Sequence, residues 1–225
     1  MSLFGRAVAE FVGTAVVVAA VVGSGIMASS LSSDAGLGLL INQLATVFAL
    51  GVVIAVLMPV SGAHINPAVT VALALRRAVS VAEATLYILA QLLGGMAGVA
   101  LAHVMFGAAA WEISTNNRLT TGTFIGEIVA TAGLIAIILI LVHRGNESLI
   151  PFLAPVWIGS GFLFTSSTSF ANPAVTVGRM FTESSSGIQP LAGAGFIGAQ
   201  LVGMLVALVL VVSMSRTPKG ATVDR

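Results

Sequence analysis

The sequence Asn-Pro-Ala-Val-Thr-Val occurs twice in this chain, once beginning at Asn66 and once at Asn172. Asn is a preferred N-cap of a helix, and Pro fits the first helical position, where no N–H donor is needed. A helix N-terminus carries a partial positive charge, and the Asn amide adds a donor beside it. Such groups can bind the oxygen of an uncharged solute and repel cations. The candidate pore residues are therefore Asn66, Pro67, Ala68, Asn172, Pro173 and Ala174.

Each motif predicts a helix of about ten residues, which is roughly 15 Å long and spans about half a bilayer. Two such half-helices entering from opposite faces would meet at their N-termini in the middle of the membrane. The loops that lead into them, 59–65 and 165–171, would lie at the same depth. Irregular backbone is tolerated there only where it is buried or lines a watery cavity, so we expect these loops to present carbonyl acceptors along a conduit.

The composition indicates a membrane protein and gives no sign of catalysis. Hydrophobic residues make up 57% of the 225 residues and charged residues only 8%, against about 25% charged in ordinary soluble domains. The formal net charge of +1 gives no case for nucleic acid, there is no Cys, and the three His residues are scattered. No nucleophile has a base at a suggestive spacing. We therefore expect no enzyme activity, no metal and no cofactor.

Six stretches are long and apolar enough to cross a bilayer, since a span needs about 20 apolar residues. The fifth is short and contains Pro151 and Pro155. The predicted spans are 7–27, 38–58, 84–107, 123–142, 149–166 and 189–213.

The basic residues predict the orientation of these spans. If the N-terminus is inside, only Arg118 and Arg179 lie outside, and the positive-inside rule is satisfied. Both termini are then cytoplasmic, with 214–225 as a cytoplasmic tail. The basic residues on the inside are Arg6, Arg76, Arg77, Arg144, Arg216, Lys219 and Arg225.

The chain contains an internal repeat. The first and fourth spans share a Glu and a Thr at matching places, and the third and sixth spans share Gln91 and Gln200. Three spans separate each element from its copy, so the second copy is inverted in the membrane. We expect one channel domain over 1–225, with inverted repeats at about 1–110 and 111–213. Such repeats place the substrate path at their interface near the midplane.

At these motifs the sequence resembles the aquaporin (major intrinsic protein) family, over nearly the whole chain. The resemblance rests on AEFVGT in the first span, SGAHINPAVT around Asn66, the second Asn-Pro-Ala and both Gln-bearing spans. It implies an all-α membrane protein with six transmembrane helices and two re-entrant half-helices. It also implies a homotetramer with a pore in each subunit, and passive conduction of water, glycerol or other small neutral solutes.

The resemblance also implies a selectivity filter, and here the sequence departs from the family. Family members usually carry Arg three residues after the second Asn, where this chain has Val175. Counting from the two Asn residues places Thr46, Ser160 and Ser169 at the other filter positions, with Phe48 as an alternative to Thr46. Small neutral side chains predict a wide filter that admits solutes bulkier than water.

The stretches GSGIMA (23–28) and TSSTSFANPAVTVGR (165–179) resemble a bacterial branch of the family found beside arsenic-resistance genes. That branch implies a location in the bacterial inner membrane. It also implies neutral hydroxides of trivalent arsenic or antimony as cargo, beside glycerol and water. A water-selective channel is the alternative within the family, and an ion- or proton-coupled transporter is the alternative from another class.

Four charged or titratable residues near the motifs need a role. Arg179 lies seven residues after Asn172 and thus on the helical face of Val175; it either lines the outer vestibule or pairs with Glu183 or with loop carbonyls. Glu10 and Glu127 match in the repeat, so we expect them to support the re-entrant loops through backbone N–H groups. His64 has the same expected role, with pore lining or pH gating as alternatives.

Overall fold

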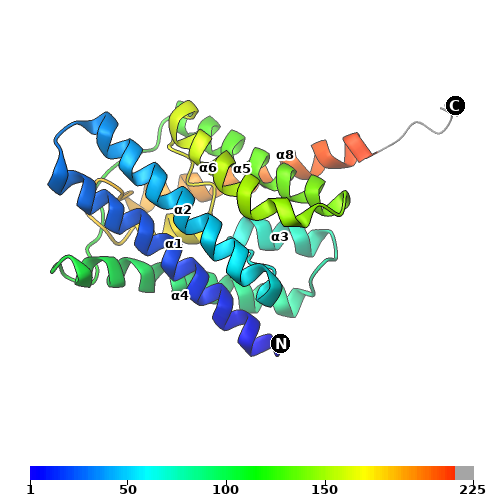
Figure 1. Cartoon of the computed structure of the whole chain (residues 1–225). Coiled ribbons are helices and arrows are strands. Elements are labelled where there is room, and N and C mark those ends of the chain that lie inside the picture. Colours follow the sequence, from blue (N-terminus) through cyan, green and yellow to red (C-terminus); the bar gives the residue numbers. More distant parts are fainter. Residues whose placement is uncertain (216–225) are drawn as a thin grey trace, which may run out of the picture.

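The computed structural model describes residues 1–215, and the elements within them are all helical (Figure 1). They are α1 (Leu3–Leu31), α2 (Ala35–Ser61), α3 (Pro67–Leu75), α4 (Val81–Met105), α5 (Thr121–His143), the 3-10 turn η1 (Glu147–Leu149), α6 (Ile150–Phe164), α7 (Pro173–Arg179) and α8 (Pro190–Ser215). Six helical segments of this part of the chain are long and apolar enough to cross a membrane. They correspond to the six predicted spans, and the fifth combines η1 with α6.

The two half-helices are α3, with nine residues, and α7, with seven. Both are shorter than the helix of roughly ten residues, about 15 Å long, that each motif predicts. Asn66 caps α3 and Asn172 caps α7, each with an extended backbone and a side-chain oxygen that accepts N–H groups of the first turn. α3 ends at Leu75 because the chain turns at once through Arg77, whose φ is 60°.

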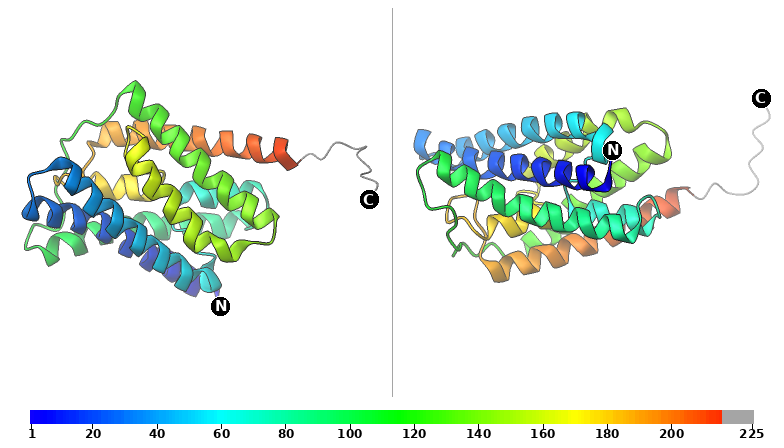
Figure 2. Two further views of the ribbon diagram at one scale, coloured as in Figure 1. Left: turned by 45° about the horizontal axis from the view of Figure 1, so that its top comes forward. Right: turned by 90° about the horizontal axis from the view of Figure 1, so that it is seen from below.

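The long helices pack in two groups that hold the half-helices between them (Figure 2). α1 lies against α2 and α4, and α5 lies against α6 and α8. Glycines permit the closest approaches: a Cβ on Gly98 would lie 2.4 Å from the carbonyl oxygen of Ala15, and one on Gly203 would lie 2.6 Å from that of Ile128. Small residues at such crossings let helix backbones approach in membranes.

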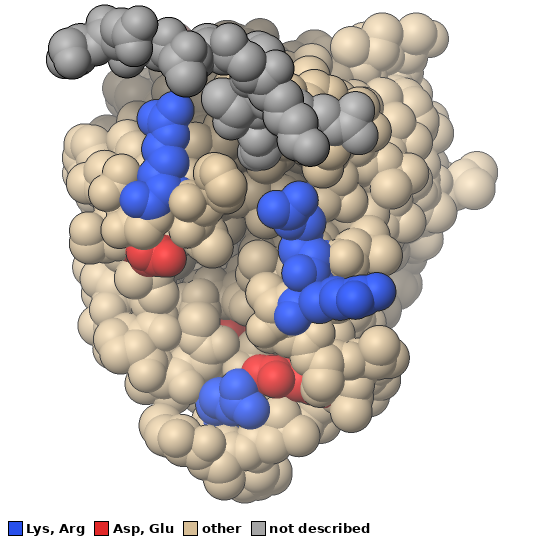
Figure 3. All heavy atoms as spheres, turned by 90° about the vertical axis from the view of Figure 1, so that its right-hand side faces the viewer, with Lys and Arg blue, Asp and Glu red and all other residues tan. Residues whose placement is uncertain are grey.

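The two ends of the helical bundle differ in charge. We call the end that holds Met1 and the turns 76–80 and 144–146 the N-terminal face, and the opposite end the far face. Figure 3 views the N-terminal face, where basic side chains lie around a central hollow. Arg6 on α1 and Glu83 on α4 form an ion pair there, the only one among residues 1–215. Of the predicted tail, 216–225 lies outside the described residues.

Candidate pore and vestibule

The two Asn-Pro-Ala motifs are joined by reciprocal hydrogen bonds. The side-chain nitrogen of Asn66 donates to the carbonyl of Ala171 at 2.8 Å, and that of Asn172 donates to the carbonyl of Ile65 at 2.8 Å. Each Asn also caps its own half-helix through its side-chain oxygen. The structure therefore brings the two motifs together with their helix N-termini adjacent, although they are separated by more than a hundred residues in the sequence.

The loops before the two motifs have the same unusual backbone. φ is positive at Ala63 and Ile65 before Asn66, and at Ser169 and Ala171 before Asn172. Non-glycine residues avoid this region, and a β-branched residue such as Ile avoids it most. Each such residue costs on the order of 1–3 kcal/mol and persists only if its surroundings enforce it. The surroundings that do so here are two buried carboxylates.

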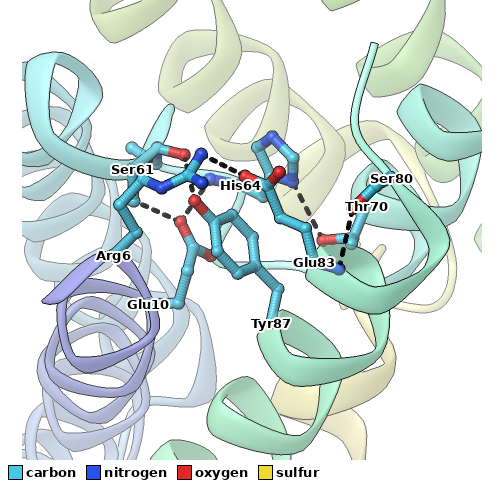
Figure 4. A network of polar contacts seen from close by, with 9 residues as sticks. Arg6, Glu10, Ser61, His64, Thr70, Ser80, Glu83 and Tyr87 are labelled. Atoms are coloured by element: carbon cyan, nitrogen blue, oxygen red, sulfur yellow. Dashed lines mark hydrogen bonds and ion pairs between the residues drawn. The ribbon is translucent and has the colours of Figure 1, made fainter. Parts of the chain in front are cut away.

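Glu10 of α1 holds the first loop. Its carboxylate accepts the backbone N–H groups of His64 at 3.0 Å and Ile65 at 2.6 Å, and the hydroxyl of Ser61 at 2.6 Å. Gln91 of α4 donates to the same carboxylate at 2.7 Å. Figure 4 shows Glu10 beneath this loop, with Ser61 and His64 beside it. A fully buried carboxylate with several donors satisfies N–H groups that no helix could pair.

Glu127 of α5 holds the second loop in the same way. It accepts the N–H groups of Phe170 and Ala171, both at 2.9 Å, and the amide of Gln200 at 2.6 Å. Both Glu side chains have no exposed surface. Their bonds go to loop backbone and Gln amides, so in this structure each carboxylate braces a re-entrant loop.

His64 lies between the first loop and its half-helix. Its ring Nδ1 lies 3.1 Å from the hydroxyl of Thr70, and its ring meets the edge of Tyr87 at 5.2 Å between centroids (Figure 4). Its backbone N–H is one of the donors to Glu10. The side chain also lines the central cavity. His64 thus contacts the group that supports the first loop and also lines this cavity, the two locations that the sequence left as alternatives.

A narrow cavity runs beside the two motifs, and we call it the lumen. Its volume is about 70 Å³, and both Asn residues and both loops line it. Its remaining wall is mostly apolar and comes from residues spaced four apart on the spans, so that each helix presents one stripe. These residues are Leu50 and Ile54 of α2, Ala154 and Ile158 of α6, Val17 and Val21 of α1, and Leu134 and Ile138 of α5.

Three of the four predicted filter residues line the lumen, namely Thr46, Ser169 and Val175. The side chain of Phe48, the alternative to Thr46, is 66% exposed on the outer surface of α2. Ser160 does not reach the lumen: it is exposed, and its hydroxyl donates to the carbonyl of Val156. Ser160 therefore does not line the filter, contrary to the prediction from the sequence.

Phe162 takes the place expected for Ser160. It lies one helical turn after Ile158, and both side chains are buried and line the lumen. Ser160, two residues from each, points to the opposite side of α6, because residues two apart do not share a helical face. The four-residue spacing of Ile150, Ala154, Ile158 and Phe162 is the sequence signal that could have identified this stripe.

Ser169 supplies a free polar group to this filter. Its side chain is 2% exposed, yet its hydroxyl has no hydrogen-bond partner in the structure. Buried polar groups are normally paired, so this hydroxyl is an exception, and it lies in the wall of the lumen with almost no exposed surface of its own. Gly161 makes room for it, since a Cβ there would lie 2.6 Å from both Cβ and Oγ of Ser169.

A wider cavity of about 540 Å³ opens at the far face, and we call it the far vestibule. Phe162 and Arg179 line both the far vestibule and the lumen, so the two spaces meet at these residues. Arg179 is buried, its Nε donates to the carbonyl of Ser186, and its guanidinium carbon lies 3.4 Å from the centre of the Phe170 ring. The sequence-based alternative of a pair with Glu183 is not seen.

Glu183 instead bonds to the segment between α4 and α5. It accepts the backbone N–H and the hydroxyl of Thr115, and these bonds hold the pKa of the carboxyl below its ordinary value. Arg179 is therefore held at the mouth of the lumen by an aromatic ring and a carbonyl rather than by an acid.

Comparison with known proteins gives the family. The profile of the family described as "MIP: Major intrinsic protein" matches residues 1–169, about three quarters of the chain. The chain belongs to the major intrinsic protein family. It is 44% identical over 205 residues to "Aquaglyceroporin AqpS" of Rhizobium meliloti, covering 91% of this chain and 88% of the relative. It is 30% identical to the "Glycerol uptake facilitator protein" of Pseudomonas aeruginosa, with 86% and 79% covered.

Among solved structures, the aquaglyceroporin from Plasmodium falciparum matches with a TM-score of 0.64 and 25% identity over 95% of both chains. This likeness confirms the predicted all-α membrane fold with six spans. Membership of the major intrinsic protein family makes this chain a multi-pass membrane channel for passive transport of neutral solutes. The family is not enzymatic, as the sequence led us to expect.

Proposed function

We propose that this channel conducts small uncharged hydroxylated solutes of about the size of glycerol. The cargo would include glycerol itself, water, and the neutral hydroxides of trivalent arsenic and antimony. The observation that carries the proposal is the chemistry of the filter, where Thr46, Phe162, Ser169 and Val175 meet around the lumen without a charged side chain among them.

This filter has two kinds of wall. Phe162 and Val175 offer apolar contact, whereas Thr46 and Ser169 add polar side chains to the wall, and the Thr46 hydroxyl, which donates to the carbonyl of Asn42, can still accept a hydrogen bond. A solute with a compact body and several hydroxyl groups can use both walls at once. A hydroxyl group that leaves water needs such replacement hydrogen bonds. Moving it into an apolar environment without a partner costs on the order of several kcal/mol.

The position of Val175 favours a cargo larger than water. The resemblance to the family implies that members usually carry Arg here, in the narrow outer filter. Val175 leaves that space open and apolar, and the nearest guanidinium is that of Arg179, one turn farther along α7 at the edge of the lumen. Phe162 makes the filter narrower than the sequence predicted, although its wall remains neutral.

The names of two relatives, an aquaglyceroporin and a glycerol uptake facilitator, support cargo of glycerol size. Arsenous acid is a neutral hydroxide of similar bulk, and its inclusion rests on the resemblance of residues 23–28 and 165–179 to the arsenic-associated branch. Water passes as the smallest member of the same class. Arsenite and antimonite would cross only as their neutral acids.

The opposed half-helices supply the barrier to cations. Each helix N-terminus carries roughly half an elementary positive charge, and Asn66 and Asn172 hold the two ends together beside the lumen. Fixed positive ends at the midplane disfavour cations and orient passing water by its oxygen. This arrangement allows neutral solutes through while the filter itself carries no charge.

A stopped-flow light-scattering panel on proteoliposomes tests the proposal. It should compare water, glycerol, urea and arsenous acid, with protein-free liposomes as the reference. We expect glycerol and arsenous acid to enter faster than in the reference, at rates linear in the gradient. Water flux without glycerol flux would establish a water-selective channel. Saturation with dependence on an ion gradient would establish a coupled transporter.

We also propose that the N-terminal face is cytoplasmic in a bacterial inner membrane. Among residues 1–215, Arg6, Arg76, Arg77 and Arg144 lie toward this face and only Arg118 and Arg179 lie toward the other, which follows the positive-inside rule. Because the chain has no native Cys, single Cys variants at Ser2 and Ser33 would report the orientation. An impermeant thiol reagent added outside intact cells should label the Ser33→Cys variant and spare the Ser2→Cys variant.

The resemblance to the family further implies a homotetramer with one pore in each subunit. The outer sides of the spans are apolar, which suits contact with lipid and contact with a neighbouring subunit equally well. The oligomeric state therefore needs its own test. Native mass spectrometry of the detergent-solubilised protein should give a species of four chains. A monomer that conducts glycerol would leave the pore intact and reject the tetramer.

A further inference from the structure

The far vestibule is lined by hydroxyl groups and two Arg side chains. It lies between the turn 32–34, the residue Arg118 and the segment 185–186, and it meets the lumen at Phe162 and Arg179. Most of its polar lining consists of hydroxyl groups, from Ser29, Ser32, Ser33, Thr168, Ser185 and Ser186. Two guanidinium groups stand among them.

These two guanidinium groups share one aromatic ring. The guanidinium carbon of Arg179 lies 3.4 Å from the centre of the Phe170 ring, and that of Arg118 lies 5.8 Å from it. Arg179 is 4% exposed. Each Arg is held by carbonyl groups, Arg179 by that of Ser186 and Arg118 by those of Ser185 and Gly187. These hydrogen bonds hold both side chains at the vestibule. Each guanidinium group still has N–H donors that bond to no protein acceptor.

Neither guanidinium forms an ion pair within the described residues, and Glu127, an acid that acts electrostatically on Arg179, is hydrogen-bonded to Phe170, Ala171 and Gln200 instead. The one ion pair there joins Arg6 and Glu83 at the opposite face. Asp34 lines the vestibule, but its carboxylate caps α2 by accepting the N–H of Leu37 at 2.7 Å. Glu183 is committed to Thr115.

The environment penalises this unpaired charge. Burial lowers the pKa of Arg118 from its ordinary value, because the charged form is poorly solvated there. Two like charges near one ring also repel each other. An anion between them would relieve both costs, since hydrogen bonds from guanidinium to an anionic oxygen are about twice as strong as neutral ones.

We propose that the far vestibule is a binding site for a small tetrahedral oxyanion such as phosphate, held between Arg118 and Arg179. The paired N–H groups of a guanidinium match the oxygen spacing of phosphate and carboxylate. Hydroxyl groups such as that of Ser32, which accepts the N–H of Asp34 and keeps its own hydrogen free, can donate to the remaining oxygens. The cavity, at about 540 Å³, is large enough for the ion with some of its water.

Occupancy of this site affects the pore, because Arg179 stands where the vestibule meets the lumen. A bound oxyanion would partly obstruct the mouth on the far face. This consequence rests on the proposed function, whereas binding itself does not, so the two are measured separately.

Binding is tested on the purified full-length protein in detergent. Inorganic phosphate is titrated at constant ionic strength against chloride, and thermal unfolding is followed by intrinsic fluorescence, because a ligand that binds only the folded state raises the Tm in a saturable way. We expect a saturable rise with phosphate in the wild type. Arg179→Gln and Arg118→Gln should each weaken phosphate binding by about tenfold.

Arg76→Gln is the matched control, because Arg76 is an exposed Arg at the N-terminal face. It should bind phosphate as the wild type does. The proposal is overturned by a wild type without saturable binding, by Gln variants that bind unchanged, or by equal loss in Arg76→Gln. If Arg179→Gln does not fold, Arg118→Gln decides alone, since Arg118 lies outside the helices.

Flux gives the second readout. Phosphate on the far-face side of proteoliposomes should slow glycerol entry in the wild type and have less effect in Arg118→Gln. A channel that conducts glycerol but ignores phosphate in both assays rejects the anion site alone. A protein that binds phosphate but conducts no glycerol rejects the proposed cargo alone.

Discussion

The side-chain nitrogen of Asn66 lies 2.8 Å from the carbonyl oxygen of Ala171, the residue that precedes the second capping Asn. The matching bond from Asn172 to Ile65 has the same length. Two half-helices that enter from opposite faces are thus joined end to end by a pair of hydrogen bonds, which we call the lock. The position of the electropositive centre beside the lumen depends on this lock, and several predictions concern the residues that make it or brace it.

Asn66→Ala should destabilise the protein. It removes the cap of α3 and the bond to Ala171, each worth on the order of 1 kcal/mol. Thermal unfolding in detergent measures the loss, and solute flux should fall with it. Asn146→Ala is the control, since Asn146 is exposed and its side chain makes no capping bond. Equal unfolding of the two variants would argue against the lock.

Glu127→Gln should weaken the second loop. The carboxylate of Glu127 accepts from Phe170, Ala171 and Gln200, and a Gln amide would face at least one of these donors with a donor of its own. A buried group left unsatisfied costs about 1–3 kcal/mol. We expect a lower Tm, compared with no change for the exposed Glu147→Gln.

The same carboxylates test the coupled-transporter alternative. If Glu10 and Glu127 only brace the loops, glycerol flux in the wild type should not respond to a pH gradient across the vesicle. An ionisable residue within a span can also serve as a proton relay. Flux driven by a proton gradient, and abolished in Glu127→Gln, would assign that role instead.

Gly161→Ala should displace Ser169 from the filter. The added Cβ would lie 2.6 Å from Cβ and Oγ of Ser169, too close for any packed pair. Overpacking of this kind costs typically about 1–3 kcal/mol and here moves a residue that lines the lumen. Glycerol permeability should fall. Gly198→Ala is the control because a Cβ there meets nothing within 4 Å, and it should conduct normally.

Glu183 should make the stability of the folded protein depend on pH at the far face. Hydrogen bonds from Thr115 lower the pKa of this carboxyl in the folded protein. A lowered folded-state pKa contributes stability at pH above the unfolded-state value, and the contribution is lost as pH falls through the lowered pKa. The wild type should therefore be more stable than Glu183→Gln at neutral pH, and the difference should vanish in acid. A difference that grows in acid would contradict this assignment.

Much of this architecture could be predicted from the sequence, for physical reasons. The spans follow from apolar length, and the half-helices follow from Asn as a cap and Pro at the first position. Glu10 and Glu127 match in the repeat, and buried carboxylates must find donors, so loop N–H groups were the expected partners. The bonds between the two motifs could not be predicted, because they join carbonyls whose direction depends on a strained backbone.

The filter was less predictable than the motifs. Counting back from Asn172 placed Ser160 in the lumen, but the count says nothing about the rotation of α6. That rotation is set by packing: Trp157 donates to the carbonyl of Ala130 on α5, and Gln43 of α2 donates to that of Gly159. The helix consequently presents Phe162. Arg179 and Val175 both line the lumen, whereas the partners of Arg179 lie in a turn that helix geometry does not describe.

The most direct test of the central claim is the glycerol permeability of wild-type proteoliposomes beside that of Val175→Arg. Val175 is 6% exposed and lines the lumen, so a guanidinium there would narrow the filter and place a charge in it. We predict wild-type glycerol flux well above that of protein-free liposomes, and a fall of about tenfold in the variant, equivalent to roughly 1.4 kcal/mol of added barrier, with water flux retained. Wild-type flux no higher than in protein-free liposomes, or equal glycerol flux in both proteins, would contradict the account.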